Sequence, residues 1–153
     1  MAVPLHPLLE PLAGLVGRWE GSGVGLWEGG FSFSDVLVFE HDGRPVLSFR
    51  EATVGGDGRG SHSETGFVLV KEDGVAHMTV AEPSGLAEAL SGLAGPGLVE
   101  VRSVGIALAP GAKPVTGVAR RLSWSGDELV SEVSVALNGE ALSPHTRSVL
   151  RRA

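Results

Sequence analysis

Apolar and polar residues alternate along most of this chain, in runs of roughly eight to eleven residues that end at glycine-rich turns. In the stretch FSFSDVLVFE, one face carries the apolar residues Phe31, Phe33, Leu37 and Phe39. Asp35 is the polar exception on that face. A period of two indicates a strand with one buried face, so this stretch is predicted to be a strand.

Short turns connect the alternating runs. The Asp-Gly pair in HDGR, residues 41–44, predicts a tight hairpin turn, and KEDG, SGDE and NGE recur between later runs rich in valine and leucine. The predicted strands span residues 18–27, 31–41, 45–54, 61–70, 75–82, 86–92, 98–108, 115–124, 129–137 and 141–150. A meander of about ten strands exposes its edges unless it closes. The sequence therefore predicts an all-β fold, a ten-stranded antiparallel up-and-down β-barrel.

Two segments need a separate interpretation. Residues 81–97, AEPSGLAEALSGLAGPG, are rich in helix-forming Ala, Leu and Glu. The flanking Pro-Ser-Gly and Gly-Pro-Gly leave little room for a helix, so strand and turn are predicted instead. The opening PLHPLLEPLAGLVG is predicted to form a short helical turn that covers one end of the barrel. Residues 1–153 then make a single domain, and ten strands leave interior room for a ligand cavity.

Composition narrows the function classes. The formal net charge of −6 and the dispersed arginines argue against a nucleic-acid partner. Cysteine is absent, which excludes disulfides, thiolate metal ligands and cysteine nucleophiles, and the absence of tyrosine excludes a phenolate ligand. No run approaches the ~18 apolar residues that span a bilayer, and the opening segment lacks the basic region of a signal peptide. We therefore expect a cytoplasmic protein with no membrane partner.

The segment GRWEGSG, residues 17–23, has two interpretations. A glycine-rich phosphate loop would need a helix after it, and an alternating run follows instead. The other interpretation is a strand whose glycines mark a bend or the close approach of another group. In that strand Trp19 is expected to be buried and to plug one end of the barrel.

Histidine and carboxylate side chains supply the candidate chemistry. His62 and Glu64 lie two residues apart, on one face of a predicted strand. Such a pair could hold a metal, could combine a base with an orienting acid, or could lie solvated at the rim of the barrel. His145 follows Ser-Pro at the start of the last strand, where a surface or capping histidine is the alternative to a functional one. A G-x-S-x-G elbow for a serine nucleophile is absent from the sequence.

Five short motifs, in this order along nearly the whole chain, resemble those of the nitrobindin family. They read G-x-W-x-G-x-G, F-x-F…F-x-x-x-G-x-P-x-L-x-F, H-x-E-x-G-F, R…W-x-G-D-x-L and P-H…L-R. Their residues are Gly17, Trp19, Gly21 and Gly23; Phe31, Phe33, Phe39, Gly43, Pro45, Leu47 and Phe49; His62, Glu64, Gly66 and Phe67; Arg121, Trp124, Gly126, Asp127 and Leu129; and Pro144, His145, Leu150 and Arg151.

The resemblance implies a barrel similar to fatty-acid-binding proteins that carries one haem b per chain in a surface cleft. It implies that His145 is the axial ligand of the haem iron and that His62 lies near the distal face. The implied ligands are nitric oxide and peroxynitrite, with isomerisation of peroxynitrite to nitrate at ferric iron. A homodimer is kept as an expectation about assembly. Two alternatives stay open: a haem-free carrier of a small hydrophobic ligand in the barrel cavity, and a haem-based nitric oxide sensor without turnover.

The chain departs from the family pattern at three places. After the first motif the family usually continues G-x-Y-P-T-I, with a threonine that contributes to the haem site, whereas this chain has a shorter segment, Trp27 to Gly30. Leu69 stands where an arginine usually follows H-x-E-x-G-F, and Val135 stands where methionine is common. The resemblance therefore implies a changed pocket lining around an intact axial histidine.

Overall fold

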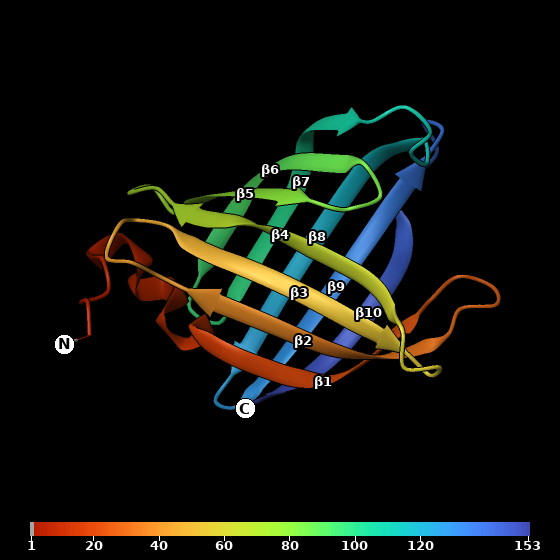
Figure 1. Cartoon of the computed structure of the whole chain (residues 1–153). Coiled ribbons are helices and arrows are strands. Elements are labelled where there is room, and N and C mark those ends of the chain that lie inside the picture. Colours follow the sequence, from red (N-terminus) through yellow and green to blue (C-terminus); the bar gives the residue numbers. More distant parts are fainter. Residues whose placement is uncertain (1) are drawn as a thin grey trace.

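The computed structural model describes residues 2–153 and consists of one closed antiparallel barrel preceded by a short helix. Each strand pairs with its neighbours in the sequence, and β1 pairs with β10 to close the sheet (Figure 1). The elements are the 3₁₀ helix η1 (Pro7–Leu15) and strands β1 (Gly17–Gly25), β2 (Ser32–Glu40), β3 (Leu47–Gly55), β4 (Gly60–Val70), β5 (Val75–Ala81), β6 (Leu86–Gly95), β7 (Leu98–Leu108), β8 (Val115–Ser125), β9 (Glu128–Leu137) and β10 (Ser143–Arg152).

The predicted ten-stranded barrel and the N-terminal helical turn are confirmed. The ambiguous stretch 81–97 forms strand, turn and strand, as predicted, although β6 continues to Gly95 because its ladder with β7 runs down to the Gly95–Leu98 pair. The placement of Phe31 on the buried face of a strand is wrong. Phe31 precedes β2 and is 49% exposed, since the chain is still turning there.

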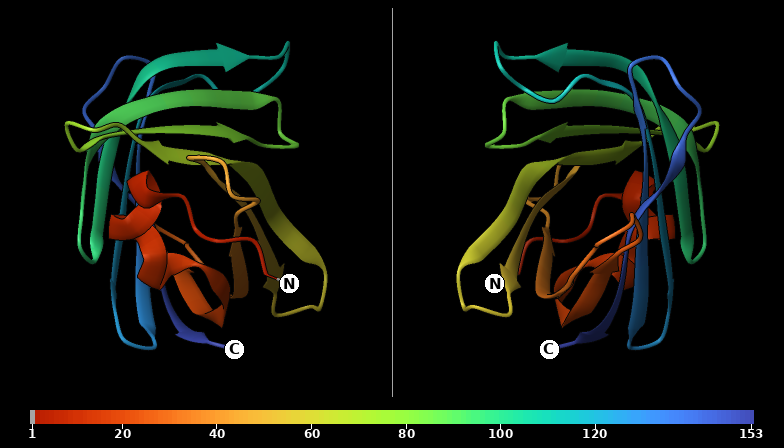
Figure 2. Two further views of the ribbon diagram at one scale, coloured as in Figure 1. Left: turned by 90° about the vertical axis from the view of Figure 1, so that its left-hand side faces the viewer. Right: turned by 90° about the vertical axis from the view of Figure 1, so that its right-hand side faces the viewer.

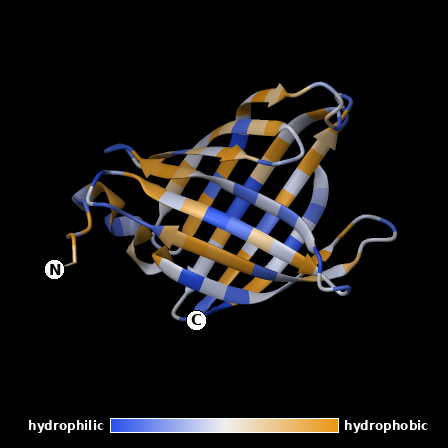
Figure 3. Cartoon of the chain, viewed as in Figure 1, coloured by the Kyte–Doolittle hydropathy of each residue, from blue (hydrophilic) through white to orange (hydrophobic). Residues whose placement is uncertain are grey.

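Helix η1 closes one end of the barrel, as the end-on views show (Figure 2). Its residues Leu9, Leu12 and Leu15 are fully buried against the apolar half of the interior. The strand residues on that half are hydrophobic and alternate with polar residues on the outer surface (Figure 3). They include Leu37, Phe39, Leu47, Phe49, Val68, Met78, Leu90, Val99, Leu122, Leu129 and Leu150.

Trp19 joins the two ends of the chain beneath η1, as the plug interpretation predicts. The indole is 0% exposed, and its Nε1–H donates to the Leu15 carbonyl at 2.9 Å. The Arg152 guanidinium lies 4.3 Å from the centre of the Trp19 ring and donates to the carbonyl oxygens of Val16 and Gly14. These contacts attach the last strand to the residues that lead into the first.

The glycines of the first strand allow the close approach that the sequence suggested. A Cβ atom on Gly21 would overlap the carbonyl oxygen of Val149 in the neighbouring strand β10. Any larger residue at Gly21 would therefore push β1 and β10 apart.

The opposite end of the barrel is open, and it is formed by the β1–β2, β3–β4, β5–β6, β7–β8 and β9–β10 loops (Figure 1). Near this end β7 and β8 separate: their ladder stops at the Arg102–Ala119 pair, while β7 stays paired with β6 up to Leu108. The interior below is filled by side chains, and the cavity found there has room for about one water molecule. A second, more open cleft of about 540 Å³ lies beside β6–β10, and its lining includes Leu26, Pro144 and Thr146. None of the described helices is long and apolar enough to cross a membrane.

Candidate functional site

His145 lies at the open end of the barrel, where β10 begins. Pro144 pairs with Ser134 and Thr146 pairs with Val133, so His145 is the extra residue of a β-bulge. Its carbonyl oxygen accepts a hydrogen bond from the Leu26 N–H at 2.8 Å, which links the bulge to the β1–β2 loop. A bulge re-aims its side chain relative to the regular strand, and here it gives an imidazole a fixed position at the mouth.

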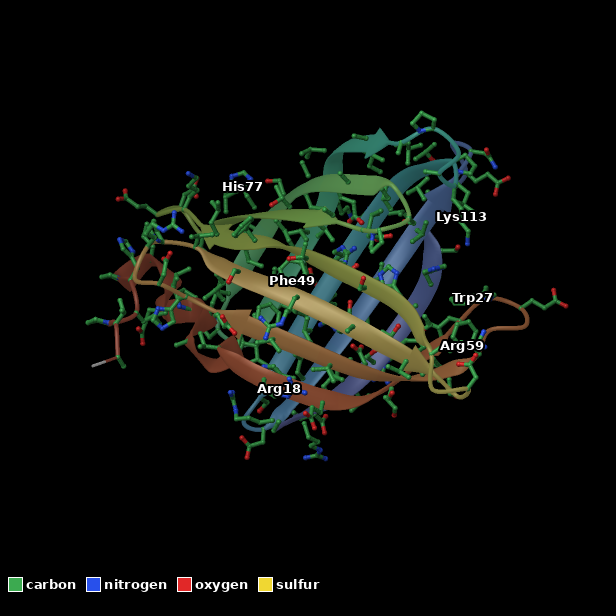
Figure 4. The ribbon with its side chains drawn as sticks, in the orientation of Figure 1. Arg18, Trp27, Phe49, Arg59, His77 and Lys113 are labelled. Atoms are coloured by element: carbon green, nitrogen blue, oxygen red, sulfur yellow. The ribbon has the colours of Figure 1, made fainter. Side chains whose placement is uncertain are left out.

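The indole of Trp27 covers one face of this imidazole. The two rings stack with centroids 4.6 Å apart and an interplanar angle of 26°. Phe31 meets the indole edge-on at 5.9 Å, and a Cβ atom on Gly25 would overlap the indole, so glycine is needed for the loop to fold back. Trp27 and Lys113 both lie at the open end of the barrel (Figure 4).

The surroundings of His145 favour its neutral form. Burial lowers the pKa of the half-buried imidazole, and the positive charges of Lys113 and His62 lower this pKa further. A neutral imidazole carries a free nitrogen lone pair, which is the state required of a metal ligand.

His62 lies on β4 at the open end of the barrel, and Glu64, the next inward-facing residue of that strand, forms a hydrogen bond with it. Its Nε2 lies 3.2 Å from Oε2 of Glu64, and its side chain is 41% exposed. The hydrogen bond to Glu64 raises the pKa of His62, although burial opposes this. The predicted pairing of His62 and Glu64 on one face of the strand is therefore present. It favours a protonated His62, and the other ring nitrogen, Nδ1, has no hydrogen-bond partner among the described residues.

Below His62, a layer of charged side chains crosses the barrel interior. Arg120 donates to both oxygens of Glu64, at 2.6 and 3.0 Å, and to both oxygens of Glu88, at 2.9 Å each. Glu82 lies 3.6 Å from the same guanidinium. Burial alone would raise the pKa of Glu64, but the Arg120 charge and the hydrogen bonds from His62 and Arg120 hold it well below its usual range.

Two further acids complete this layer on the other side of Glu64. Asp35 is 1% exposed, and its Oδ2 accepts a hydrogen bond from the Ser148 hydroxyl at 2.6 Å. Glu51 on β3 lies directly opposite Glu64 on β4 and diagonally from Asp35 on β2, and its side chain lines the same small cavity as Glu64. Donor atoms of Glu51, His62 and Glu64 all lie within 4.8 Å of one another, a spacing at which a cation could bind, although Arg120 already occupies both Glu64 oxygens.

The sequence interpretation found His62, Glu64 and Asp35 but missed Glu51, Glu88 and Arg120. A signal was present for two of them: Arg120 stands between Val118 and Leu122 at period two, and Glu88 stands likewise within a run of alternating apolar residues. A charged residue on an apolar strand face is the pattern that identifies an inward-facing polar group.

The residues of the first motif lie away from His145. Gly17 and Trp19 lie near η1 at the closed end, and Gly21 and Gly23 lie along β1 next to β10. Among the departures from the family pattern, Leu69 alternates with the buried Val68 and Val70 and so points outward, and Val135 packs against the apolar interior. Only the Trp27 departure contacts His145.

Comparison with known proteins gives a consistent family. Residues 8–152 match the family described as "THAP4-like, heme-binding beta-barrel domain". Peroxynitrite isomerase 1 of Mycolicibacterium paratuberculosis is 36% identical over 163 aligned residues, covering 99% of both chains. The peroxynitrite isomerase of Streptomyces griseus is 35% identical, covering 96% of this chain and 84% of that protein. The crystal structure of Rv2717c from M. tuberculosis matches with a TM-score of 0.89 at 33% identity, covering 98% of this chain and 99% of that one. This protein therefore belongs to the family of THAP4-like, heme-binding β-barrel domains.

Proposed function

We propose that this chain binds one haem b through the imidazole of His145 and isomerises peroxynitrite to nitrate. The observation that carries the proposal is the state of His145, a half-buried neutral imidazole fixed at the open mouth of the barrel by a bulge and a stacked indole. The family match and the relatives named peroxynitrite isomerase support the cofactor and the reaction.

The residues around His145 fit such a group. Leu26, Trp27 and Phe31 are large apolar side chains exposed at the mouth, as a site for a flat apolar ring requires. Lys113 is close enough to lower the pKa of His145, so its ammonium group is available to a carboxylate of the cofactor. His145 would be the axial ligand, with Trp27 maintaining the plane of its ring.

When bound, haem would supply an iron that can bind nitric oxide or peroxynitrite and that, in the ferric form, would act as a Lewis acid. The chain contributes the orientation and charge around that position. His62, protonated and held by Glu64, offers its free ring N–H to an anion at the mouth. The rearrangement of peroxynitrite to nitrate neither takes up nor releases a proton. His62 would therefore stabilise the negative charge of the anion and keep its own proton.

The charged layer argues against a haem-free carrier that holds its ligand beside Arg120. The cavity there has room for about one water molecule and is lined in part by Glu51, Glu64 and Arg120. A small hydrophobic ligand in that place would have to displace a charged layer, which is unfavourable. The larger cleft near Pro144 and Thr146 is therefore the space left for such a ligand.

Titration with hemin tests the proposal. We expect a defined Soret band that saturates at one hemin per chain. Stopped-flow mixing with peroxynitrite should then show faster decay over the ferric protein than over the same protein without hemin, with nitrate as the product. Decay no faster than over the hemin-free protein would leave ligand binding, including nitric oxide sensing, as the function.

Removal of the stacked indole should loosen the axial imidazole. Replacing Trp27 with alanine exposes His145 to water, so we expect the pKa of His145 to rise toward its ordinary value in an NMR titration. A lost stacking contact of about 0.5–1.5 kcal/mol corresponds to roughly two- to tenfold faster release of hemin to an acceptor protein. Trp27→Phe should restore most of the effect. Phe67→Ala, at an exposed residue of β4, is the control; equal changes in both alanine variants would exclude a role for the stacking.

A further inference from the structure

One oxygen of a fully buried carboxylate has no hydrogen-bond partner among the described residues. It is Oδ1 of Asp35, and the other oxygen, Oδ2, accepts the Ser148 hydroxyl at 2.6 Å. A buried acceptor without a donor costs free energy, and native structures rarely leave one unsatisfied. The neighbouring group that could supply a donor is the carboxyl of Glu51, because Glu51 pairs with Leu37, two residues from Asp35 on β2, and its side chain lines the interior cavity.

Glu51 lies between two acids of different character. On one side, Glu64 already accepts three hydrogen bonds, two from Arg120 and one from His62, and is held as a carboxylate. On the other side, Asp35 has a free acceptor. A third carboxylate between these two would face two negative charges without a donor of its own.

We propose that Glu51 carries a proton at neutral pH, that it donates this proton to Oδ1 of Asp35, and that this acid pair keeps the mouth of the barrel receptive to anions. Glu51 is half-buried as a residue, and it lines the small interior cavity together with Glu64 and Arg120. Burial, followed by the charges of Glu64 and Asp35, raises the pKa of Glu51 well above its ordinary value, in agreement with this proposal.

The charges that face Glu51 come from every side of the barrel. The carboxyl groups of Glu64, Glu82 and Glu88 lie around the guanidinium of Arg120. Glu51 lies opposite Glu64 on the neighbouring strand, with Asp35 diagonal to it on β2. If all were ionised, the layer would carry a large negative excess even with His62 protonated. Such an excess, directly below His62, would repel peroxynitrite and the carboxylates of haem. The proton on Glu51 removes one of these charges and places no new cation in the interior.

A pair of neutral replacements separates the proton from the hydrogen bond, and it uses the chain without cofactor. Glu51→Gln keeps an N–H that can donate to Asp35, whereas Glu51→Leu keeps neither charge nor donor. We expect the urea midpoint of Glu51→Gln to equal or exceed that of the wild type at neutral pH, and that of Glu51→Leu to fall below both. If the leucine and glutamine variants are equally stable, the hydrogen bond to Asp35 is wrongly assigned.

The pH dependence tests the proton itself. The native state binds a proton on Glu51 that the unfolded chain releases near its ordinary pKa of 4.5, so wild-type stability should fall as pH rises above that value until Glu51 ionises in the native state. Glu51→Gln should lack this part of the fall, so the difference in urea midpoint between Glu51→Gln and the wild type should widen as pH rises above 4.5. The infrared carbonyl band of a protonated acid should weaken in Glu51→Gln and persist in Glu40→Gln, an exposed control on β2. Parallel stability profiles and an unchanged band would overturn the proposal.

The same donor atoms are close enough to hold a cation, which is the competing explanation. Addition of Zn²⁺ or Mn²⁺ to the metal-free protein should leave the urea midpoint of the wild type unchanged. Stoichiometric binding that raises the midpoint and is lost in Glu51→Gln would mean that a metal ion, and not a proton, neutralises the layer.

The effect on anions rests on the proposed function and is measured separately. With hemin bound, the azide affinity of the ferric wild type should weaken severalfold as rising pH ionises Glu51. In Glu51→Gln, the azide affinity should not show this part of the decrease. If hemin does not bind at all, the proposed function fails while the stability and infrared results still decide the protonation of Glu51. If hemin binds and the two proteins show the same azide profile, the acid pair has no role at the mouth.

Discussion

Replacing Arg120 with methionine should destabilise the barrel by about 3–5 kcal/mol, the cost of leaving buried charges without their partner. Among the described residues, Arg120 is the only cation that contacts both Glu64 and Glu88, and all three side chains are almost fully buried. Methionine fills a similar volume, so the loss comes from the two carboxylates and not from a cavity. Urea denaturation at neutral pH, followed by tryptophan fluorescence, measures the change.

The neighbouring Arg121 provides a matched control. It lies on the outer face of the same strand, half-exposed, and pairs with Glu100 and Glu132. Because exposed ion pairs contribute little, Arg121→Met should change stability by no more than about 0.5 kcal/mol. Adding Glu64→Gln and Glu88→Gln to Arg120→Met should recover part of the loss. An Arg120 variant as stable as the Arg121 variant would mean that the interior carboxylates are neutral without the guanidinium.

Acidification should have opposite effects on the wild type and on Arg120→Met, because the pKa of Glu64 differs between the two proteins. In the wild type the pKa of Glu64 is held below its ordinary value of 4.5, so the pair stabilises the fold above that pH and is lost as pH falls. Without the guanidinium, burial raises the pKa of Glu64, and acidification should then stabilise the variant relative to neutral pH.

Replacing His145 with alanine should abolish the defined Soret complex, with an affinity loss of at least about a hundredfold. The imidazole is the proposed axial ligand, and no other histidine occupies the bulge. Since His145 is only half-buried, the fold should remain intact, as circular dichroism would show. Added imidazole should partly restore the band, because a small ligand can occupy the space beside Trp27 that the side chain leaves.

The control for this experiment is His77, which lies on β5 and points to the outer surface (Figure 4). His77→Ala should bind hemin like the wild type. If His145→Ala and the wild type give the same Soret band and the same affinity, the axial assignment is wrong, whatever the activity of the preparation.

The fold was predictable because its signals are local. Alternation at period two, together with short Asp-Gly and Asn-Gly turns, defines strands that can only pair with their sequence neighbours, and closure follows from the need to remove the edges. Even Asp35 was visible as an exception on an apolar face. Its partner Ser148 was not, because the two residues meet only when the last strand closes the barrel.

The site was less predictable for the same reason. The stacking of Trp27 on His145 joins the first loop to the last strand, and the Arg120 layer joins β4, β6 and β8. Local periodicity can place Arg120 and Glu88 on an inward face, but it cannot show which residues of other strands they contact. The bulge at His145 adds a further difficulty, because one extra residue breaks the alternation that assigns side chains to a face. The resemblance to the family motif predicted His145, whereas the residues that pack around it could be identified only from the structure.

The pairing of β1 with β10, and the contacts of Arg152 with the residues before β1, have a consequence for how the chain acquires its fold. Gly21 pairs with Leu150, so β1 and β10 can pair only after β10 has left the ribosome. Until then β1 is an unpaired edge beside β2, and Trp19 lacks the guanidinium that covers its ring. Contacts of such wide sequence separation are slow to form, and a nascent chain of this protein should depend on protection of that edge during synthesis.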